Sequence, residues 1–562
     1  MSHRREIRAI RPRSAPDPSR TVPTMNTPQI LTRRSFLNTA TGLAATAALS
    51  SLTDVPLFVQ KALAEGTLGK PDANGRVKKL LFIFLRGAND GLNSVIPHGD
   101  DAYGPKIRDN IAIPVDPAQG WNAQGKALFP EAGTSGGTFA YPYSLPLGNG
   151  FAGLHPALKF LVPVYNAGEL AVIHRVAYPQ QSRSHFDSQA YWETGAPRAT
   201  MVKDGLLYRA MVESGRPGRN SLTGVSFQNS LPLLLRGSRA AMTNLSDPTR
   251  YDLLGVPNTA DGNAKAARAL EAATGAAFPG KANRDLLQQQ YENMRRTLEI
   301  FAGIDFSETG NTFVDGDNTD GNKPYHLFPT TNAKNGAGPS GTTNPGYVVP
   351  TASYGYFNQL KSAALVLNKT DALVAGTQID GWDTHSNQGG VTGAHANLLQ
   401  RVGWSIYALR QYFRRHAEQC RWEDLVVVTL SEFGRTTIEN SDNGTDHAEA
   451  SVMFVAGGGV KGLRTDATGK VARSGVFNCG PSDPVPWQTG MNGSMFQSTG
   501  RYLQRATDFR SVLGKLVRDH LGATQEQLDR IIPGYADPSQ GLKSGGIQAQ
   551  DKVRVTGEPD LV

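Results

Sequence analysis

The chain has few cysteines and no long hydrophobic run. Its 562 residues include only Cys420 and Cys479, so at most one disulfide can form and the fold does not depend on a disulfide framework. The same scarcity excludes a cysteine-rich metal site. After the N-terminal leader, no stretch reaches the length of a membrane-spanning helix, so we expect no stable membrane span.

The excess of positive charge is concentrated near the N-terminus. The chain carries 57 Lys and Arg against 49 Asp and Glu, a net charge of +8. Residues 1–64 hold nine of the basic and three of the acidic residues, which leaves about +2 for the remainder. The basic character therefore belongs mainly to this segment, and we expect no nucleic-acid partner for the rest of the chain.

Residues 1–64 have the pattern of a twin-arginine signal peptide. Arg33 and Arg34 stand before Ser35-Phe36-Leu37, an uncharged stretch rich in Ala, Thr and Ser follows, and Ala62-Leu63-Ala64 is typical of a cleavage site. The alternative is an ordinary surface helix that contains two arginines. The three features occur in the order required for export, so the pattern predicts passage through the Tat translocase to the periplasm or the outside.

Residues 65–562 alternate between apolar strand patterns and helical patterns. This alternation predicts an α/β domain with a mixed, largely parallel sheet flanked by helices. We expect a mainly helical insertion at 200–305, a flexible loop at 308–350 and a helix at 507–521 that begins at Thr507. Five apolar runs are predicted strands: 80–85, 169–174, 372–378, 425–430 and 451–456.

Acidic and histidine side chains lie close to the ends of these runs. Because parallel strands present their carboxyl ends at one edge of a sheet, we expect these side chains to gather there. Carboxylate and imidazole groups together suit Zn²⁺ or a similar divalent ion, with Mn²⁺ and Ca²⁺ as alternatives. The predicted metal ligands are Asp90, Asp383, His385, Asp446 and His447.

Each of these positions also has a structural interpretation. Asp446 with His447 can be a loop carboxylate beside a hydrogen-bonded imidazole. Asp383 and His385, two residues apart on an extended segment, point to the same side, but Asp383 can instead cap its own backbone in a turn. Asp90 follows a strand and can be a turn carboxylate.

The candidate catalytic residues are Ser184, Arg183 and Glu432. Ser184 is a candidate nucleophile, and its activation is expected from the metal rather than from His185, since neighbouring side chains on an extended segment diverge. Arg183 and Arg86 are candidate anion-binding groups, with surface salt bridges as the alternative. Glu432 would order the metal ligands or act as an acid or base.

Several motifs resemble the DUF1501 family. They occur in the same order as in that family over almost all of the exported portion. They are FLRGANDGLNSVIP (84–97), GLHPAL (153–158), SRSHFDSQAYWETG (182–195), GWDTH (381–385), LSEFGRT (430–436), GTDHAEASVMFVAGGGVKG (444–462) and TDFRSVL (507–513).

The family is similar in fold to the alkaline phosphatase and sulfatase superfamily. This resemblance implies a mixed α/β sheet with metal ligands on loops after the strands. It places Asp90 at the first Asp ligand and Ser184 in the nucleophile region. The formylglycine signature of sulfatases is absent around Pro179, which argues against a typical sulfatase.

Two functions follow as hypotheses. The first is an exported metal-dependent hydrolase that acts on a phosphate or sulfate ester of a small molecule or glycan. The second is a non-catalytic exported protein that binds a cell-envelope partner or a glycan on the same scaffold.

Overall fold

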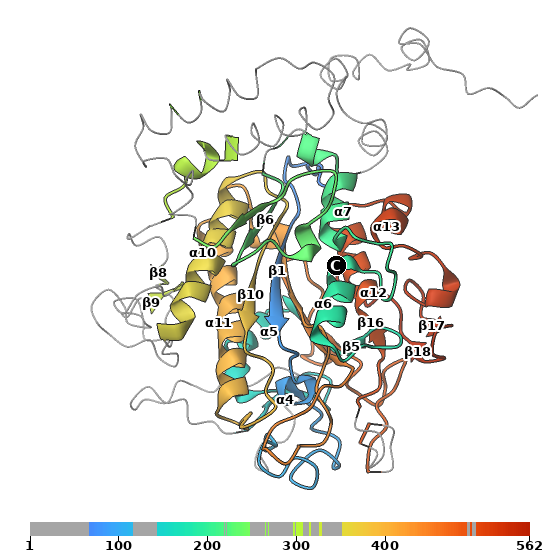
Figure 1. The fold of residues 1–562 in the computed structure, drawn as a ribbon. Coiled ribbons are helices and arrows are strands. Elements are labelled where there is room, and N and C mark those ends of the chain that lie inside the picture. The colour runs from blue at the N-terminus through green and yellow to red at the C-terminus, as the bar shows by residue number, and fades with distance from the viewer. Residues whose placement is uncertain are drawn as a thin grey trace, which may run out of the picture. The chain divides into compact units, whose positions relative to one another are not determined.

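The centre of the computed structural model is a mixed sheet whose five longest strands lie at the five predicted apolar runs (Figure 1). The structure describes residues 67–115, 143–218, 220, 222–247, 265, 268, 296–297, 299–306, 314–315, 325–328, 351–491, 495–496 and 502–562. The predicted signal peptide lies outside these residues. Among them, no helix is both long and apolar enough to cross a bilayer.

Within the described residues the main sheet has nine strands in the order β15-β5-β12-β11-β1-β10-β6-β7, with β16 also paired to β5. The fold class is therefore α/β, as predicted. The strands are β1 (Lys79–Arg86), β5 (Leu170–Ala177), β6 (Gly224–Phe227), β7 (Thr243–Leu245), β10 (Val374–Asp380), β11 (Leu425–Leu430), β12 (Ser451–Ala456), β15 (Val476–Phe477) and β16 (Thr507–Asp508).

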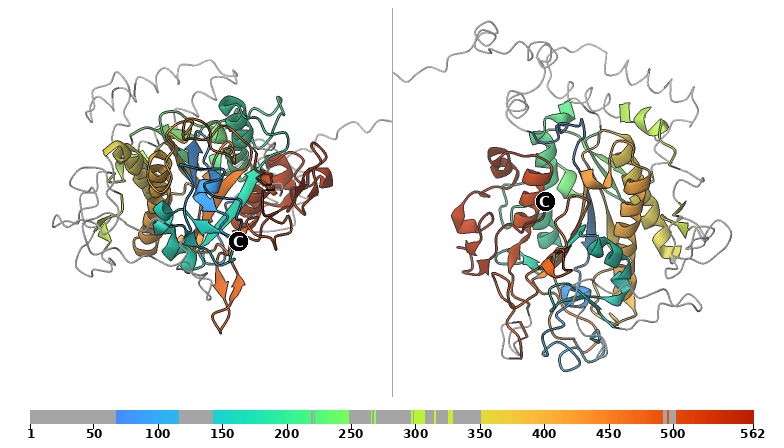
Figure 2. Two further views of the ribbon diagram at one scale, coloured as in Figure 1. Left: turned by 90° about the horizontal axis from the view of Figure 1, so that it is seen from below. Right: turned by 180° about the vertical axis from the view of Figure 1, so that it is seen from behind.

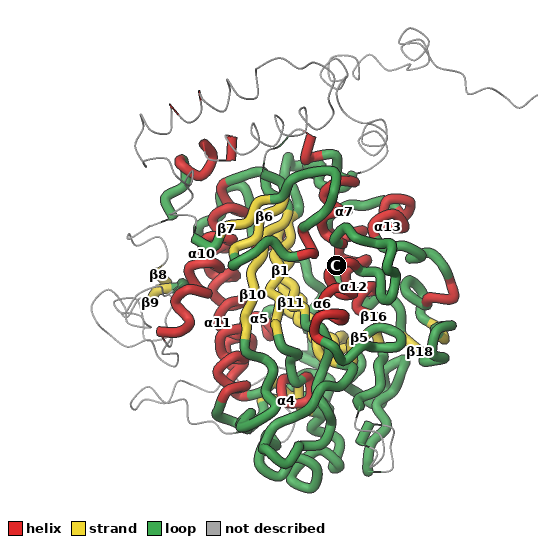
Figure 3. The backbone as a smooth tube through the Cα atoms, in the orientation of Figure 1, coloured by secondary structure: helices red, strands yellow, loops and turns green. Residues whose placement is uncertain are grey.

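One strand runs against the others. β12 is antiparallel to both of its neighbours, β11 and β5, whereas β1 is parallel to β10 and β11. The amino end of β12 therefore lies at the same edge as the carboxyl ends of β1, β5, β10 and β11. Loops gather at this edge below the strands in Figure 3. The residues that enter β12 consequently meet the residues that leave the other strands.

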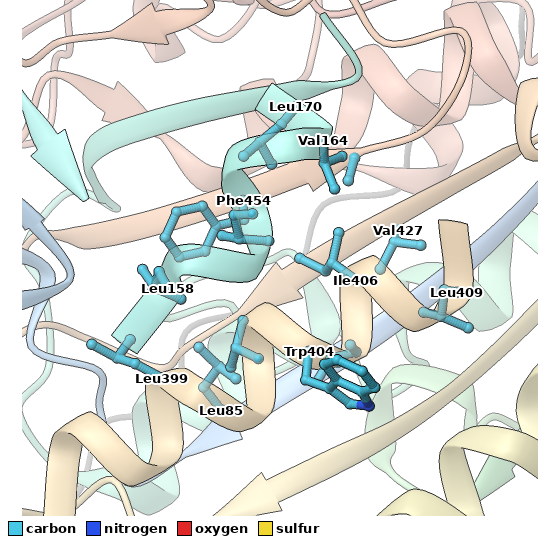
Figure 4. Close-up of a cluster of buried hydrophobic side chains, with 14 of the residues drawn as sticks. Leu85, Leu158, Val164, Leu170, Leu399, Trp404, Ile406, Leu409, Val427 and Phe454 are labelled. Atoms are coloured by element: carbon cyan, nitrogen blue, oxygen red, sulfur yellow. The ribbon is translucent and has the colours of Figure 1, made fainter. Parts of the chain in front are cut away.

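The sheet is buried on both faces, which explains the continuous apolar runs. In β1, Leu81, Ile83 and Leu85 pack into one core cluster, and the alternate residues of the strand pack into a second cluster. Figure 2 shows helices on either side of the sheet. Figure 4 shows part of the first cluster, where Leu85 and Val427 lie near Leu399 and Ile406.

The first cluster includes residues of α10 (Tyr354–Lys369), α11 (Ala394–Arg415), η1 (Pro156–Leu161) and α5 (Val162–Asn166). The second includes residues of α6 (His185–Thr194), α7 (Leu206–Glu213), α12 (Phe509–Lys515) and α13 (Gln525–Ile531). The shorter elements include α4 (Gly91–Ser94), β2 (Val95–Ile96), β3 (Leu145–Pro146), β4 (Gly153–Leu154), η2 (Arg216–Gly218), η3 (Leu233–Leu235), η7 (Thr351–Ser353), η8 (Trp422–Asp424), β13 (Arg464–Thr465), β14 (Val471–Arg473), η9 (Leu516–His520), η10 (Pro538–Gln540), β17 (Gly546–Ile547) and β18 (Arg554–Val555).

The mainly helical insertion predicted at 200–305 needs correction. Its first part contains α7 but also β6 and β7, which extend the main sheet beyond β10. Short strands of three or four residues are difficult to distinguish from helical spacing by pattern alone. Much of the remainder of this segment lies outside the described residues. So does most of the loop predicted at 308–350, in which β8 (Val314–Asp315) pairs with β9 (Tyr325–His326).

The helix predicted from Thr507 begins two residues later. Thr507 and Asp508 form β16, and the Asp508 carboxylate accepts a hydrogen bond from the Arg510 amide to cap α12. Asp508 rather than Thr507 is thus the capping residue. Cys420 and Cys479 are both buried free thiols, so the structure has no disulfide between them.

Candidate metal centre

Three histidines and one aspartate meet at the edge where β12 begins and the other strands end. His185 begins α6 after β5, Asp383 and His385 follow β10, and His447 precedes β12. We call these four residues the convergent site. Their segments are far apart in sequence, and the strand order of the sheet brings them together.

The Nε2 atom of His447 lies close to the Nε2 atoms of the other two histidines. His447 Nε2 is 3.0 Å from His185 Nε2 and 2.9 Å from His385 Nε2. Asp383 Oδ1 is 3.1 Å from the Nε2 atoms of both His385 and His447, and Asp383 Oδ2 is 3.4 Å from His185 Nε2. His447 Nε2 thus has three polar neighbours: the Nε2 atoms of His185 and His385, and Asp383 Oδ1. One ring nitrogen carries at most one proton, so hydrogen bonding alone does not explain this arrangement.

The opposite ring nitrogen of each histidine has its own hydrogen-bond acceptor. His185 Nδ1 is 2.9 Å from Glu432 Oε1, His385 Nδ1 is 3.3 Å from Asp446 Oδ1, and His447 Nδ1 is 2.9 Å from the Arg183 carbonyl oxygen. Because these acceptors carry no proton to donate, each neutral imidazole keeps its proton on Nδ1. The Nε2 lone pairs are then directed toward one another, as in histidines that bind a metal through Nε2.

A buried aromatic ring supports two of these imidazoles. Phe433 is fully buried, and its ring centroid lies 4.8 Å from those of His185 and His447. The opposite side of the site is open, because the side chains of Asp383 and His385 are 45% and 44% exposed. The site therefore combines ordered side chains with access from solvent.

Arg435 connects the loops that form the site. Its buried guanidinium donates hydrogen bonds to Asp383 Oδ1 and to the carbonyl oxygens of Gly87, Ala88, Trp382 and Thr445. Burial alone would raise the pKa of Asp383, but the hydrogen bond and charge of Arg435 outweigh it, and the net pKa is lowered. Asp383 is consequently an anion whose position is fixed.

The protonation of the other groups follows from their surroundings. The hydrogen bond with Glu432 raises the pKa of His185, whereas burial lowers the pKa of His447. Burial works to raise the pKa of Glu432, but the hydrogen bonds from His185, Gln189 and the Gly87 amide hold it below its usual value. Glu432 is thus a buried carboxylate that orients His185.

The structure places the five predicted metal ligands in three different environments. It brings Asp383, His385 and His447 together at their Nε2 and carboxylate atoms. Asp446 lies one step further out, where its carboxylate contacts His385 Nδ1 and accepts a hydrogen bond from Asn440 Nδ2 at 3.0 Å. In this arrangement Asp446 orients a histidine.

Asp90 is not brought to the convergent site. Its carboxylate caps α4 and forms a buried ion pair with Arg108 at 2.6 Å, and Gln388 Nε2 donates to it at 2.7 Å. Although burial alone would raise the pKa of Asp90, the charge of Arg108 and these hydrogen bonds lower it. The structure does not bring Asp90 to the other predicted ligands, and its oxygens already have internal partners.

The predicted nucleophile also has another role. Ser184 is the N-cap of α6, where its hydroxyl accepts a hydrogen bond from the Asp187 amide at 3.4 Å. Its side chain has no contact with the convergent site among the hydrogen bonds of the described residues. This position does not support a nucleophilic serine.

The two candidate anion-binding arginines differ in availability. Arg86 forms a salt bridge with Glu193 at 2.7 Å and lies over the Phe84 ring, so its guanidinium is already engaged. Arg183 is exposed, lies over the Tyr502 ring and forms no ion pair with a described residue. Arg183 is therefore the better placed of the two to meet an anion.

Sequence reasoning missed His185 as a member of the site, because it considered His185 only as a base for Ser184. The sequence signal that could have identified it is that one histidine lies close to an end of each of three predicted strands: His185, His385 and His447. The roles of Arg435 and Arg108 were also missed, since a buried arginine that binds several loop carbonyls has no characteristic local spacing.

None of the curated proteins matches the chain. A family model described as "Protein of unknown function (DUF1501)" matches residues 258–476. This span contains Asp383, His385 and His447, whereas His185 lies before it. The match supports the DUF1501 family for this chain.

Proposed function

We propose that this protein is an exported metal-dependent hydrolase of phosphate or sulfate esters. One divalent ion would be held by His185, Asp383 and His447, with His385 beside them. The observation that carries the proposal is the convergence of three Nε2 atoms, each on an imidazole whose Nδ1 faces an acceptor. The alkaline phosphatase-like fold remains part of this proposal and rests on the resemblance in sequence.

The donor set favours zinc. Zinc accepts imidazole nitrogen and carboxylate oxygen, whereas calcium prefers oxygen ligands alone, and manganese is an intermediate case. For a tetrahedral zinc ion with Zn–N distances of about 2.0–2.1 Å, neighbouring ligands are about 3.3 Å apart. The ligand atoms of His185, Asp383 and His447 are 3.0 to 3.4 Å apart, which is close to this value.

A zinc ion bound here would supply a water molecule whose pKa is lowered to about 7, and it would polarise the ester. Glu432 and Asp446 keep the imidazoles oriented, and Arg435 keeps Asp383 in place. Arg183 can hold the anionic ester group at the open side. Hydrolysis would join the water oxygen to phosphorus or sulfur and break the bond to the ester oxygen, and a proton from the water would pass to the departing alcohol.

The second candidate is a non-catalytic exported protein that binds a cell-envelope partner or glycan. One observation favours it, namely that His385 Nε2 lies 2.9 Å from His447 Nε2 and could add a fourth protein ligand, as is typical of structural zinc sites. The exposure of Asp383 and His385 weighs against it, because structural sites are usually closed.

Export through the Tat translocase to the periplasm or the outside is also proposed, from the motif at Arg33 and Arg34. Replacing both arginines with lysine is expected to leave the protein in the cytoplasm. Fractionation of cells that express each form would test this, and equal export of both forms would contradict it.

The test of the proposed function is metal content combined with hydrolysis. Residues 65–562, purified without chelator, are expected to contain about one equivalent of zinc and to hydrolyse phosphate or sulfate esters. His447→Ala should lose both the metal and the activity. His416→Ala, which changes a histidine at the end of α11, should keep both. Hydrolysis that persists after the metal is removed would overturn the metal-dependent mechanism, and metal binding without any turnover would favour the second candidate.

A further inference from the structure

A cavity lies at the edge of the sheet opposite to the convergent site. It is lined by Lys79, which begins β1, by Asp371, shortly before β10, and by Gln419, after α11. The convergent site lies beyond the carboxyl ends of the same parallel strands. The length of β1 separates the two places, about 26 Å for eight residues that rise about 3.3 Å each. A ligand in the cavity would therefore not touch the candidate metal centre.

Lys79 is the buried cation of this cavity. The residue is 2% exposed, and its ammonium group donates hydrogen bonds to the carbonyl oxygens of Leu367 and Thr370, each at 2.6 Å. An ammonium group has three hydrogens, so one remains, and no carboxylate of the described residues lies at ion-pair distance. Burial lowers the pKa of Lys79 to about 8, so a bound anion would stabilise its charged form.

Two arginines line the same cavity. Arg216 donates through Nε and Nη1 to the carbonyl oxygens of Gly69 and Asp371, and its Nη2 has no hydrogen-bond partner among the described residues. Arg76 Nε is buried without a hydrogen-bond acceptor and lies 3.9 Å from Asp424 Oδ2. Backbone carbonyl groups thus fix the positions of Lys79 and Arg216 without neutralising their charge.

Two acidic side chains line the cavity as well, and both are more exposed than Lys79. Asp371 accepts a hydrogen bond from Asn220 Nδ2 at 3.0 Å, and Glu418, whose side chain is 56% exposed, pairs with Lys369 at 2.9 Å. An ionised carboxylate only accepts hydrogen bonds. Hydrogen phosphate has a hydrogen to donate to such a group, whereas sulfate has none at neutral pH. Cations together with acceptors therefore favour phosphate over sulfate.

We propose that this cavity binds a phosphate ion. Its volume of about 280 Å³ is just below the range of about 300–1,000 Å³ typical of small-molecule sites, so it suits a small ligand. Arg76, Lys79 and Arg216 would donate charge-assisted hydrogen bonds to the phosphate oxygens, and Asp371 or Glu418 would accept the phosphate hydrogen. The inference does not rest on the proposed function, because no residue of the convergent site lines the cavity.

Calorimetric titration of potassium phosphate into the full-length chain at pH 7, with the ionic strength held constant by chloride, tests this inference. The parent is expected to bind phosphate more tightly than sulfate. Arg216→Gln should weaken phosphate binding about 10- to 100-fold, the size of a hydrogen bond to a charged group. Arg76→Gln changes a partly exposed side chain, which the fold should tolerate, and it should also weaken binding. The matched control is Arg464→Gln, which removes an exposed arginine of β13 outside the cavity and should keep the affinity.

His447→Ala distinguishes the cavity from the metal centre, since it removes a proposed metal ligand and should still bind phosphate. Binding that is lost in His447→Ala but kept in both cavity variants would place the anion at the metal centre and overturn the inference. No binding by the parent, or equal binding by the parent and both cavity variants, would overturn it too. Equal affinity for sulfate would overturn phosphate as the ligand. If Arg216→Gln does not fold, as judged by circular dichroism, Arg76→Gln decides.

Discussion

The convergent site and the network around Asp90 occupy the same edge of the sheet but differ in their hydrogen bonding. In the network, the carboxylate of Asp90 has Arg108, Gln388 and two amides of α4 as partners, and it is almost fully buried. In the convergent site, acceptor atoms face one another, and Asp383 is nearly half exposed. A position after a strand is common to both, so position alone does not identify a ligand.

The difference lies in how the polar atoms are satisfied. A buried carboxylate with a full set of donors has no further ligand to gain. Nitrogen lone pairs that meet without a donor repel one another and are stabilised by a cation. Counting the partners of each polar atom therefore separates the structural aspartate from the candidate metal centre.

The largest expected effect comes from breaking the network. Asp90→Asn should destabilise the protein by about 3–5 kcal/mol, because it leaves the buried charge of Arg108 without its counter-ion. Urea unfolding of the metal-free protein measures this. The matched control is Asp560→Asn, which breaks an exposed pair with Lys461 and should change the free energy of unfolding by about 0–1 kcal/mol.

A folded Asp90→Asn variant should retain zinc, since Asp90 is outside the convergent site. If this variant were stable but had lost its metal, the division between the two regions would be wrong, and Asp90 would regain its predicted role as a ligand.

A smaller effect is expected from Asp446, which contacts a histidine rather than the metal position. Asp446→Ala should weaken zinc binding about 10- to 100-fold without abolishing it, as is typical of residues that orient a ligand. Competition with a zinc-binding dye measures the affinity. Asp442→Ala changes an exposed aspartate of the same loop and serves as the control. Complete loss of zinc in Asp446→Ala would make Asp446 a direct ligand.

The smallest expected effect is on how the free energy of unfolding depends on pH. A histidine beside the Asp90 network and a histidine of the convergent site are expected to change it in opposite directions. His395 lies beside the network, with its Nε2 3.1 Å from Asn89 Oδ1. Burial lowers the pKa of His395 to about 4, so its stabilising contribution is complete above an unfolded pKa of about 6.5 and is lost as the pH falls. The raised pKa of His185 gives a contribution that is complete below about pH 6.5 and is lost as the pH rises through the folded pKa.

Between pH 7.5 and 6.5 the free energy of unfolding should fall by a few tenths of a kcal/mol for each histidine that behaves like His395. Urea unfolding of the metal-free protein at the two pH values measures the change. In His185→Gln the opposing contribution is missing, so the fall should be steeper. An equal fall in both proteins would show that Glu432 does not raise the pKa of His185 in solution.

Much of the sheet could be predicted from sequence, because its central strands are continuous apolar runs. The strand at Leu425–Leu430 and the strand at Ser451–Ala456 have the predicted bounds. β6 and β7 were missed because their three or four residues owe their structure to pairing with β10 and with each other. Pairing of this kind is a tertiary effect that local pattern does not contain.

For the candidate site, sequence reasoning located the edge but not the partners. It brought Asp383, His385 and His447 to one place, since each lies next to a predicted strand. It could not separate Asp90 from them, because the neutralising Arg108 is eighteen residues away and is brought near by α4 and the following loop. Nor could it assign His185, whose ring orientation depends on Glu432 across the sheet edge.

The antiparallel direction of β12 has a consequence for how this site can change. Residues 431–450 leave β11 and return to its immediate neighbour β12, and the two arms pair through the Gly434, Thr436 and Ala448 amides. This single connection carries one member of the convergent site and three of the groups that hold the others in place: His447, Glu432, Arg435 and Asp446. Both ends of this connection are fixed on neighbouring strands. Exchanging it between related proteins would therefore replace His447 and these three supporting groups together, while His185, Asp383 and His385 would stay on their own segments.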